Sequence, residues 1–112
     1  MTGDLIEVPS GQDVRFIEAV IDKAGPAGAT ARFRFLAPAI GTGVDADTAA
    51  GDMQMLCDSY ALPKTDGMVP EPQQIVISLS AVELPFGESA PDVPQFFEAY
   101  SIADGHCIWE VF

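Results

Sequence analysis

The chain has few basic residues. Five Lys and Arg stand against 17 Asp and Glu among its 112 residues, which gives a formal charge of −12 at pH 7. Because phosphate binding needs clustered Lys and Arg, this charge argues against nucleic acids and anionic membrane surfaces as partners. The charge either serves solubility alone or attracts a positively charged molecule. We expect an unidentified protein partner of cationic character.

The chain also lacks long apolar runs. No stretch approaches the ~18 apolar residues of a membrane-spanning helix, so membrane insertion is not expected. The length and the 48% hydrophobic content fit one folded domain over residues 1–112. The first residues show no basic region followed by an apolar region, as a signal peptide would. Two alternatives remain: a cytoplasmic protein with reduced thiols, or a mature chain whose leader was removed, which the polar start favours.

No motif for catalysis or metal binding is present. The chain has one histidine, His106, no Gly-x-Ser-x-Gly turn and no glycine-rich phosphate loop. Asp45, Asp47 and Asp52 faintly resemble a calcium loop, but the required glycine and final glutamate are absent, so helix capping explains them better. His106 and Cys107 point to opposite faces of a predicted strand, which excludes a shared zinc site. We predict no catalytic residue, no metal site and no cofactor.

Three polar residues near the end of the chain are candidate binding positions: Glu98, His106 and Glu110. Glu98 is the acidic residue on the predicted core face of its strand, near the open end of a hairpin. His106 follows a predicted turn, where an exposed surface role is expected. A pocket in which these residues or aspartates converge would favour a carrier or an enzyme, whereas a flat apolar patch would favour a protein-binding module.

Alternation and turn residues predict about five or six strands. The segment 31–36 alternates strictly, which places Phe33 and Phe35 inward and Arg32 and Arg34 outward. The expected strands cover residues 5–8, 14–21, 31–36, 74–79 with an extension toward 86, 96–102 and 106–112.

One helix is predicted between Asp45 and Pro63. Asp45 or Asp47 caps its start, and Pro63 closes it. Asp58 lies on the side opposite the apolar face, so its replacement is expected to cost little stability. The apolar face has helical spacing and consists of Ala49, Met53, Leu56, Cys57 and Tyr60.

The last two strands are predicted to form a hairpin. Asp104-Gly105 is a strong turn signal, and a two-residue turn there avoids the like-charge pair of Glu98 and Glu110 that a three-residue loop would create. We expect the helix to pack on the more apolar face of this hairpin, which carries Phe96, Tyr100, Ile102, Cys107, Trp109 and Val111.

The chain contains two cysteines, Cys57 and Cys107. Cys57 lies in the predicted helix, and Cys107 lies in the last strand on the face that the helix must cover. A bond between them would place the protein in an oxidising compartment. The alternative is two buried reduced thiols that pack as small hydrophobic residues. We predict an α+β domain with an antiparallel sheet, one main helix on one face, a C-terminal hairpin and a Cys57–Cys107 disulfide.

A family resemblance covers most of the chain. The segments that carry it are Arg32–Phe35, Asp52-Met53, Leu56-Cys57, Tyr60–Pro63, Gln74–Leu79, Phe86-Gly87, Gln95–Tyr100, Asp104-Gly105, Cys107–Glu110 and Phe112. They resemble a family of small uncharacterised proteins of marine and photosynthetic, Rhodobacter-like alphaproteobacteria. Its members usually carry a signal peptide ahead of the segment matching Val8–Gly11, which implies a periplasmic protein. Because the family is of unknown function, the resemblance implies no activity, substrate or catalytic residue.

The residues that stand out all have structural explanations, which favours a non-catalytic role. We therefore expect a periplasmic binding or accessory protein that acts through protein–protein contact. The alternatives are a small-molecule or metal carrier and a small enzyme. Since Arg15, Arg32 and Arg34 lie in the second and third predicted strands, we expect a cationic partner to dock elsewhere.

Overall fold

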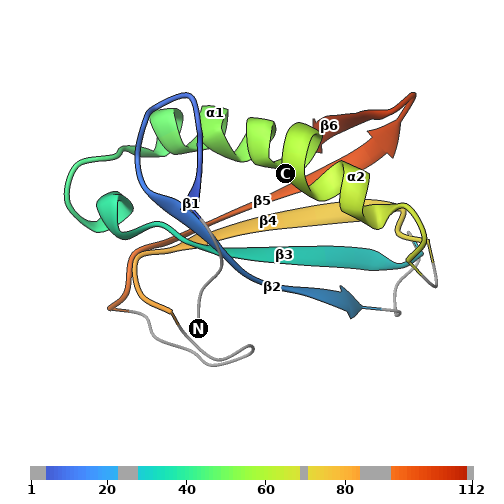
Figure 1. Cartoon of the computed structure of the whole chain (residues 1–112), viewed down its shortest axis with the longest axis horizontal. Coiled ribbons are helices and arrows are strands. Elements are labelled where there is room, and N and C mark those ends of the chain that lie inside the picture. Colours follow the sequence, from blue (N-terminus) through green and yellow to red (C-terminus); the bar gives the residue numbers. More distant parts are fainter. Residues whose placement is uncertain (1–4, 23–27, 69–70, 84–91, 111–112) are drawn as a thin grey trace.

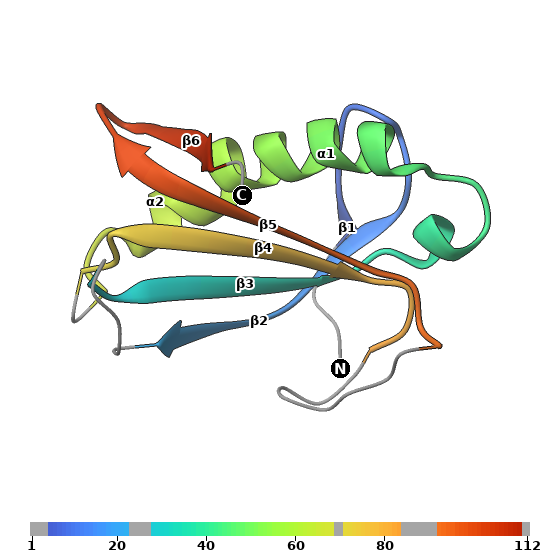
Figure 2. The same cartoon turned by 180° about the vertical axis from the view of Figure 1, so that it is seen from behind.

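The computed structural model describes residues 5–22, 28–68, 71–83 and 92–110. Within them, six strands form one mixed sheet in sequence order, and a helical segment packs on one face (Figures 1 and 2). The strands are β1 (Leu5–Ile6), β2 (Val14–Asp22), β3 (Thr30–Leu36), β4 (Gln74–Ser80), β5 (Gln95–Ala103) and β6 (His106–Glu110). This confirms the predicted fold class.

The sheet departs from the expected antiparallel arrangement at its centre. Four neighbouring pairs are antiparallel, but β3 and β4 are parallel, with Phe33 opposite Ile77 and Phe35 opposite Leu79. The helical segment causes the difference, because it returns the chain across the sheet before β4 begins. A parallel pair needs such a crossover, whereas antiparallel neighbours can be joined by a short turn.

The helical segment consists of η1 (Pro38–Gly41), α1 (Ala46–Met55), a π-type turn η2 (Leu56–Ala61) and α2 (Leu62–Thr65). Asp45 caps α1, as predicted, by accepting a hydrogen bond from the Thr48 N–H at 2.8 Å. The prediction that Pro63 closes the helix is wrong, since the helix continues to Thr65. The π-type turn resets the hydrogen-bond register, and Pro63 then occupies the first turn of α2, where a missing N–H is tolerated.

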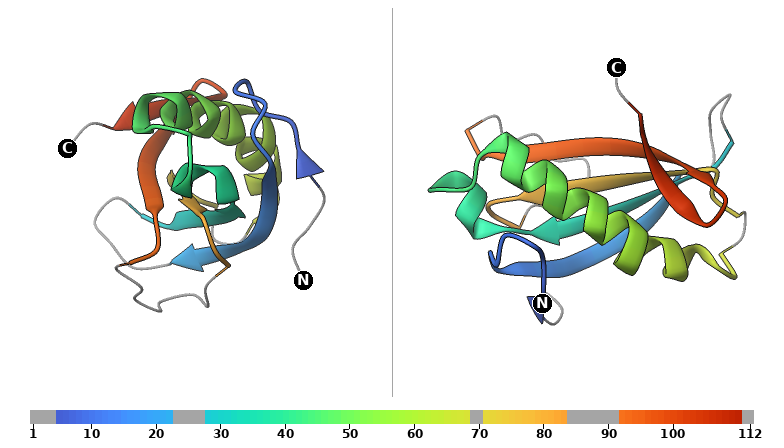
Figure 3. Two further views of the ribbon diagram at one scale, coloured as in Figure 1. Left: turned by 90° about the vertical axis from the view of Figure 1, so that its left-hand side faces the viewer. Right: turned by 90° about the horizontal axis from the view of Figure 1, so that it is seen from above.

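The core lies between the helical segment and the inner face of the sheet, which is the face that the helix covers (Figure 3). The predicted apolar face of the helix is confirmed, although Tyr60 is only half-buried. The ring of Tyr60 packs against that of Phe16, with their centroids 5.3 Å apart. The expected inward orientation of Phe33 and Phe35 is confirmed as well. The fully buried side chains of the core include Phe33, Phe35, Met53, Leu56, Cys57, Ile75, Ile77, Leu79 and Tyr100.

The C-terminal hairpin has the predicted two-residue turn. Ala103 pairs with His106 and Tyr100 with Trp109, while Asp104 and Gly105 both take positive φ angles of 52° and 75°. Trp109 faces the helix side as expected but is 50% exposed, because β6 is the edge strand and lies at the margin of the helix-covered area.

Three expected strand extensions differ or fall outside the described residues. β1 ends at Ile6 rather than Val8, and β4 ends at Ser80. The expected extension of β4 toward Phe86 is not seen at residues 81–83, which form no strand, and its remainder from residue 84 lies outside the described residues, as do residues 111 and 112 of the last expected strand. Among the helices of the described part of the chain, none is long and apolar enough to cross a membrane.

Candidate functional site

A disulfide joins the helical segment to the edge of the sheet. The sulfur atoms of Cys57 in η2 and Cys107 in β6 lie 2.11 Å apart, which confirms the predicted pair. Both residues are buried, at 0% and 5% exposure. The two cysteines are 50 residues apart in sequence, and for a loop of that size the chain-entropy model gives about 4 kcal/mol of stabilisation.

Two helix side chains form hydrogen bonds to the backbone of β6 beside the disulfide, on the side of the strand away from β5. The backbone N–H of Cys107 donates to Asp58 Oδ1 at 2.8 Å, and its carbonyl accepts from Gln54 Nε2 at 3.0 Å. Gln54 also donates to Asp58 Oδ2 at 2.9 Å. The expectation that Asp58 can be replaced at little cost did not include this contact with β6. The sheet curls until β6 lies beside the helix (Figure 3), and the half-buried Asp58 bonds to that strand.

Glu98 lies on the inner face of β5, as predicted, beside this junction. Its Oε2 accepts a hydrogen bond from the indole N–H of Trp109. The neighbouring Tyr100 is 1% exposed. Burial, and then the negative charges of Glu98 and Asp58, raise the pKa of the Tyr100 phenol above its ordinary value. The hydrogen bond between Trp109 and Glu98 links β6 to β5.

The other two candidate residues lie on the outer face of the sheet, away from the helix. His106 is exposed beside the hairpin turn, and Glu110 is half-buried opposite Ala99. Because strand residues alternate between faces, His106 and Glu110 are separated from Glu98 by the sheet itself. They are also four positions apart along β6, or roughly 13 Å at the usual rise per residue. The three candidate positions do not form one site.

A buried carboxylate anchors the connection between β1 and β2. Asp52 of α1 is 1% exposed. It accepts hydrogen bonds from the Ser10 N–H at 2.9 Å, from the Ser10 hydroxyl and from Gln12 Nε2 at 2.7 Å. The sequence held a signal for this role, because Asp52 shares helical spacing with Ala49 and Leu56 and therefore lies at the margin of the apolar face.

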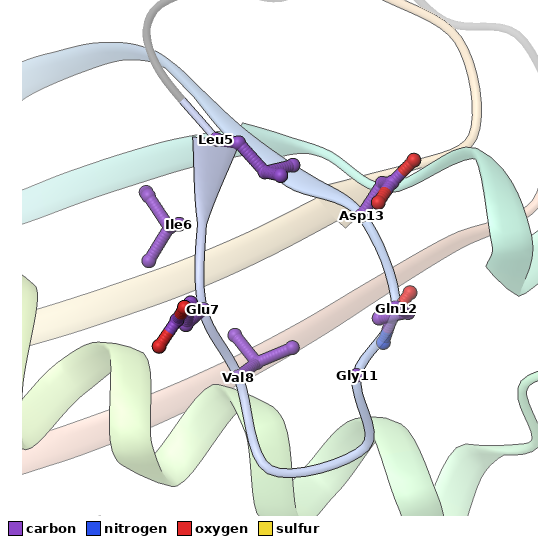
Figure 4. A pocket seen from close by; sticks show the side chains of 7 residues that line it. All are labelled: Leu5, Ile6, Glu7, Val8, Gly11, Gln12 and Asp13. Carbon is purple, nitrogen blue, oxygen red and sulfur yellow. The ribbon is translucent and has the colours of Figure 1, made fainter.

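The same connection surrounds a pocket of about 300 Å³ (Figure 4). Its walls are mainly aliphatic on the β1 limb and polar on the other limb, where Gln12 and Asp13 lie. In Figure 4 the carboxylates of Glu7 and Asp13 lie on opposite limbs and do not converge. Of the residues that the structure describes, no three His, Cys, Asp or Glu side chains form a group able to hold a metal ion. The residues that line the pocket are Leu5, Ile6, Glu7, Val8, Gly11, Gln12 and Asp13.

Basic side chains gather on the outer face of the sheet. Strand pairing places Arg15 opposite Leu36 and Arg34 opposite Glu18, and Arg32 follows the same alternation. Arg34 forms an ion pair with Glu18, whose side chain remains 43% exposed. Three of the five basic residues of the chain thus share one face.

Comparison with curated proteins and with solved structures finds no match. A family model does match, over residues 1–112, and its description is that of a family of unknown function. The match covers the segments around both cysteines, the helix and all six strands. The chain belongs to the family of unknown function DUF6497.

Proposed function

We propose that this protein is a non-catalytic periplasmic binding or accessory protein that acts through contact with a cationic protein. The observation that supports a cationic partner is the distribution of charge: the chain carries −12 overall, and three of its five basic residues share the outer face of the sheet. A field of this sign speeds association with a positive surface and slows association with acidic proteins.

The internal polar side chains support a non-catalytic role. Asp52 holds the β1–β2 connection, and Asp58 and Gln54 hold β6. Glu98 accepts a hydrogen bond from Trp109. Each of these groups is already engaged in a contact that fixes the fold, so each is a positioning group in our proposal.

The Cys57–Cys107 disulfide supports an oxidising compartment, of which the bacterial periplasm is one. Fractionation of cells that express the full-length gene product would test this assignment. We expect the protein in the periplasmic fraction, with no free thiol before reduction. Recovery in the cytoplasm with two free thiols would refute it.

The partner is tested by capture from a native periplasmic extract, followed by kinetics with the purified candidate. Raising salt from about 50 to about 500 mM shortens the Debye length from about 14 to about 4 Å, so association should slow markedly. Association that does not depend on salt, or a partner that is itself strongly acidic, would refute the proposal.

The pocket in the β1–β2 connection favours a second candidate, a carrier of a small molecule. Its volume of about 300 Å³ is at the lower end of the range of ligand sites. A thermal-shift screen of small metabolites would test it, with Val8→Trp as the variant that fills the pocket. A ligand that stabilises the native protein and not this variant would support the carrier.

A further inference from the structure

The two edge strands of the sheet differ in what contacts their outward-facing backbone groups. On the β6 side, Asp58 and Gln54 bond to the backbone N–H and carbonyl of Cys107. On the other side, β1 pairs only with Val14 and Arg15 of β2. Residues 16–22 of β2 pair with β3 along one side, and no strand of the described residues lies along their other side (Figures 1 and 2).

This edge has the composition of a strand that pairs readily. Residues 16–22 read Phe-Ile-Glu-Ala-Val-Ile-Asp, without proline, glycine or lysine. Proteins usually protect such an edge with lysine, proline, a bulge or a covering segment. Among the residues that the structure describes, β2 carries one such device, the bulge between Phe16 and Glu18. Beyond it, residues 18–22 keep an unbroken register with β3 over roughly 15 Å.

We propose that residues 18–22 of β2 accept an extended strand from a cationic protein, which extends the sheet beyond β2. The proposal rests on the proposed function, because it names where and how the protein contact is made. In this mode, main-chain hydrogen bonds supply affinity, and alternate side chains supply specificity. The edge offers apolar contact to the added strand through the exposed Ala19 and the half-buried Val20 and Ile21.

The residues of β2 define the chemistry of the added strand. Glu18 and Val20 point to the outer face, where they pair with Arg34 and Arg32, so Ala19 lies on the inner face. Glu18 is 43% exposed although it is bonded to Arg34, so it can accept a second cation. The matching strand therefore carries Lys or Arg on the face of Glu18 and small or β-branched residues on the inner face, opposite Ala19 and Ile21.

This placement revises the expectation that a partner avoids the two strands that carry the arginines. Arg32 and Arg34 lie on β3, one strand in from this edge, and Arg15 lies where β1 pairs with β2, whereas Glu18 lies on the edge strand itself. A second copy of this chain is the less suitable occupant, because each copy carries −12 and presents the same acidic edge. Like charges across a strand pair destabilise the pairing.

The test uses the intact oxidised protein and a capped nine-residue peptide of alternating lysine and valine. Backbone amide exchange is measured with and without saturating peptide. We expect exchange of the outward-facing amides among residues 18–22 to slow by at least about tenfold, with β6 unchanged. A peptide of the same sequence, N-methylated at alternate residues along its pairing edge, keeps the charge but cannot form the ladder, so it should give no protection.

A pair of protein variants separates edge pairing from general attraction. Ala19→Lys places a charge on the open edge, and Ser59→Lys makes the same charge change on the exposed surface of the helix. We expect the first to weaken peptide binding at least about tenfold more than the second. Equal effects of the two variants, or equal binding of the two peptides, would refute the edge proposal.

Other occupants give distinct results. A dimer in light scattering of the protein alone, with protection of residues 18–22, would overturn the proposal in favour of a second copy. Absence of protection at β2 would also overturn it. The proposed function would survive that result if a captured cationic protein still bound in a salt-dependent manner through another surface.

Discussion

Replacing Asp52 with alanine should lower the free energy of unfolding by about 2–4 kcal/mol. The carboxylate of Asp52 is 1% exposed. It receives hydrogen bonds from the Ser10 N–H, the Ser10 hydroxyl and Gln12 Nε2. Alanine removes all of these acceptor contacts at once and releases the β1–β2 connection from α1.

The size of this loss depends on whether the donors of Ser10 and Gln12 find another hydrogen-bond partner after the substitution. A hydrogen bond to a charged group contributes about 1.5–3 kcal/mol, so three bonds would exceed 4 kcal/mol if they were additive. They are not additive, because Ser10 is exposed and both of its donors can turn to water. Removing a buried charge also relieves its desolvation cost. Gln12 is half-buried, and its amide loses its partner, so the net loss remains in the stated range.

Urea unfolding, followed by circular dichroism at pH 7, measures this loss. Asp47→Ala is the matched control, because Asp47 is exposed in the first turn of the same helix, where its charge is favourable to the helix dipole. The control should lose less than about 1 kcal/mol. Amide exchange around Ser10 should quicken in Asp52→Ala alone. A loss below about 1 kcal/mol for Asp52→Ala, or equal losses for both variants, would refute the anchoring role.

Three further predictions use the same unfolding measurement. Reducing the Cys57–Cys107 bond should cost about 4 kcal/mol and raise the intact mass by two hydrogens, whereas an unchanged mass would refute the bond. Leu56→Ala should cost about 2–5 kcal/mol through cavity formation, and Asp58→Ala about 1–2 kcal/mol through the lost bond to β6, so an effect near zero for Asp58→Ala would contradict its bridging role. Because the pKa of Tyr100 is raised in the folded protein, folding favours the neutral phenol. Its contribution to the free energy of unfolding is complete below the ordinary pKa of 10.0 and is lost as pH rises beyond it. Tyr100→Phe should therefore flatten the fall in stability as pH rises above about 10, and an unchanged slope would contradict the assignment.

The features that local sequence determines depend on backbone preferences of a few adjacent residues. Strict alternation around Phe33 and Phe35 predicts a strand with one buried face, and the structure has it. Asp104-Gly105 predicts a two-residue turn because both residues tolerate positive φ. Asp45 predicts the helix start because its carboxylate reaches the N–H three residues ahead. The Cys57–Cys107 pair was also predictable, since the hairpin register turns Cys107 toward the helix.

Other features depend on partners far away in sequence, and no local pattern specifies them. The parallel pairing of β3 and β4 depends on where the helix returns the chain. Asp58 meets Cys107 only because the curled sheet carries β6 to the helix, across 49 sequence positions.

The candidate site shows the same division between sequence and tertiary structure. The sequence indicates Glu98, His106 and Glu110 as polar residues of one hairpin, but alternation in the folded sheet separates Glu98 from the other two. Within the described residues, β1 pairs with two residues of β2, so no described strand lies along the rest of that edge. The sequence by itself determined that the chain folds as an acidic α+β domain, because the order of apolar residues and the charge are both properties of the sequence. Tertiary structure alone decided which polar groups bond within the fold and which edge of the described sheet has no neighbouring strand, because each depends on the distance between segments that the chain brings together.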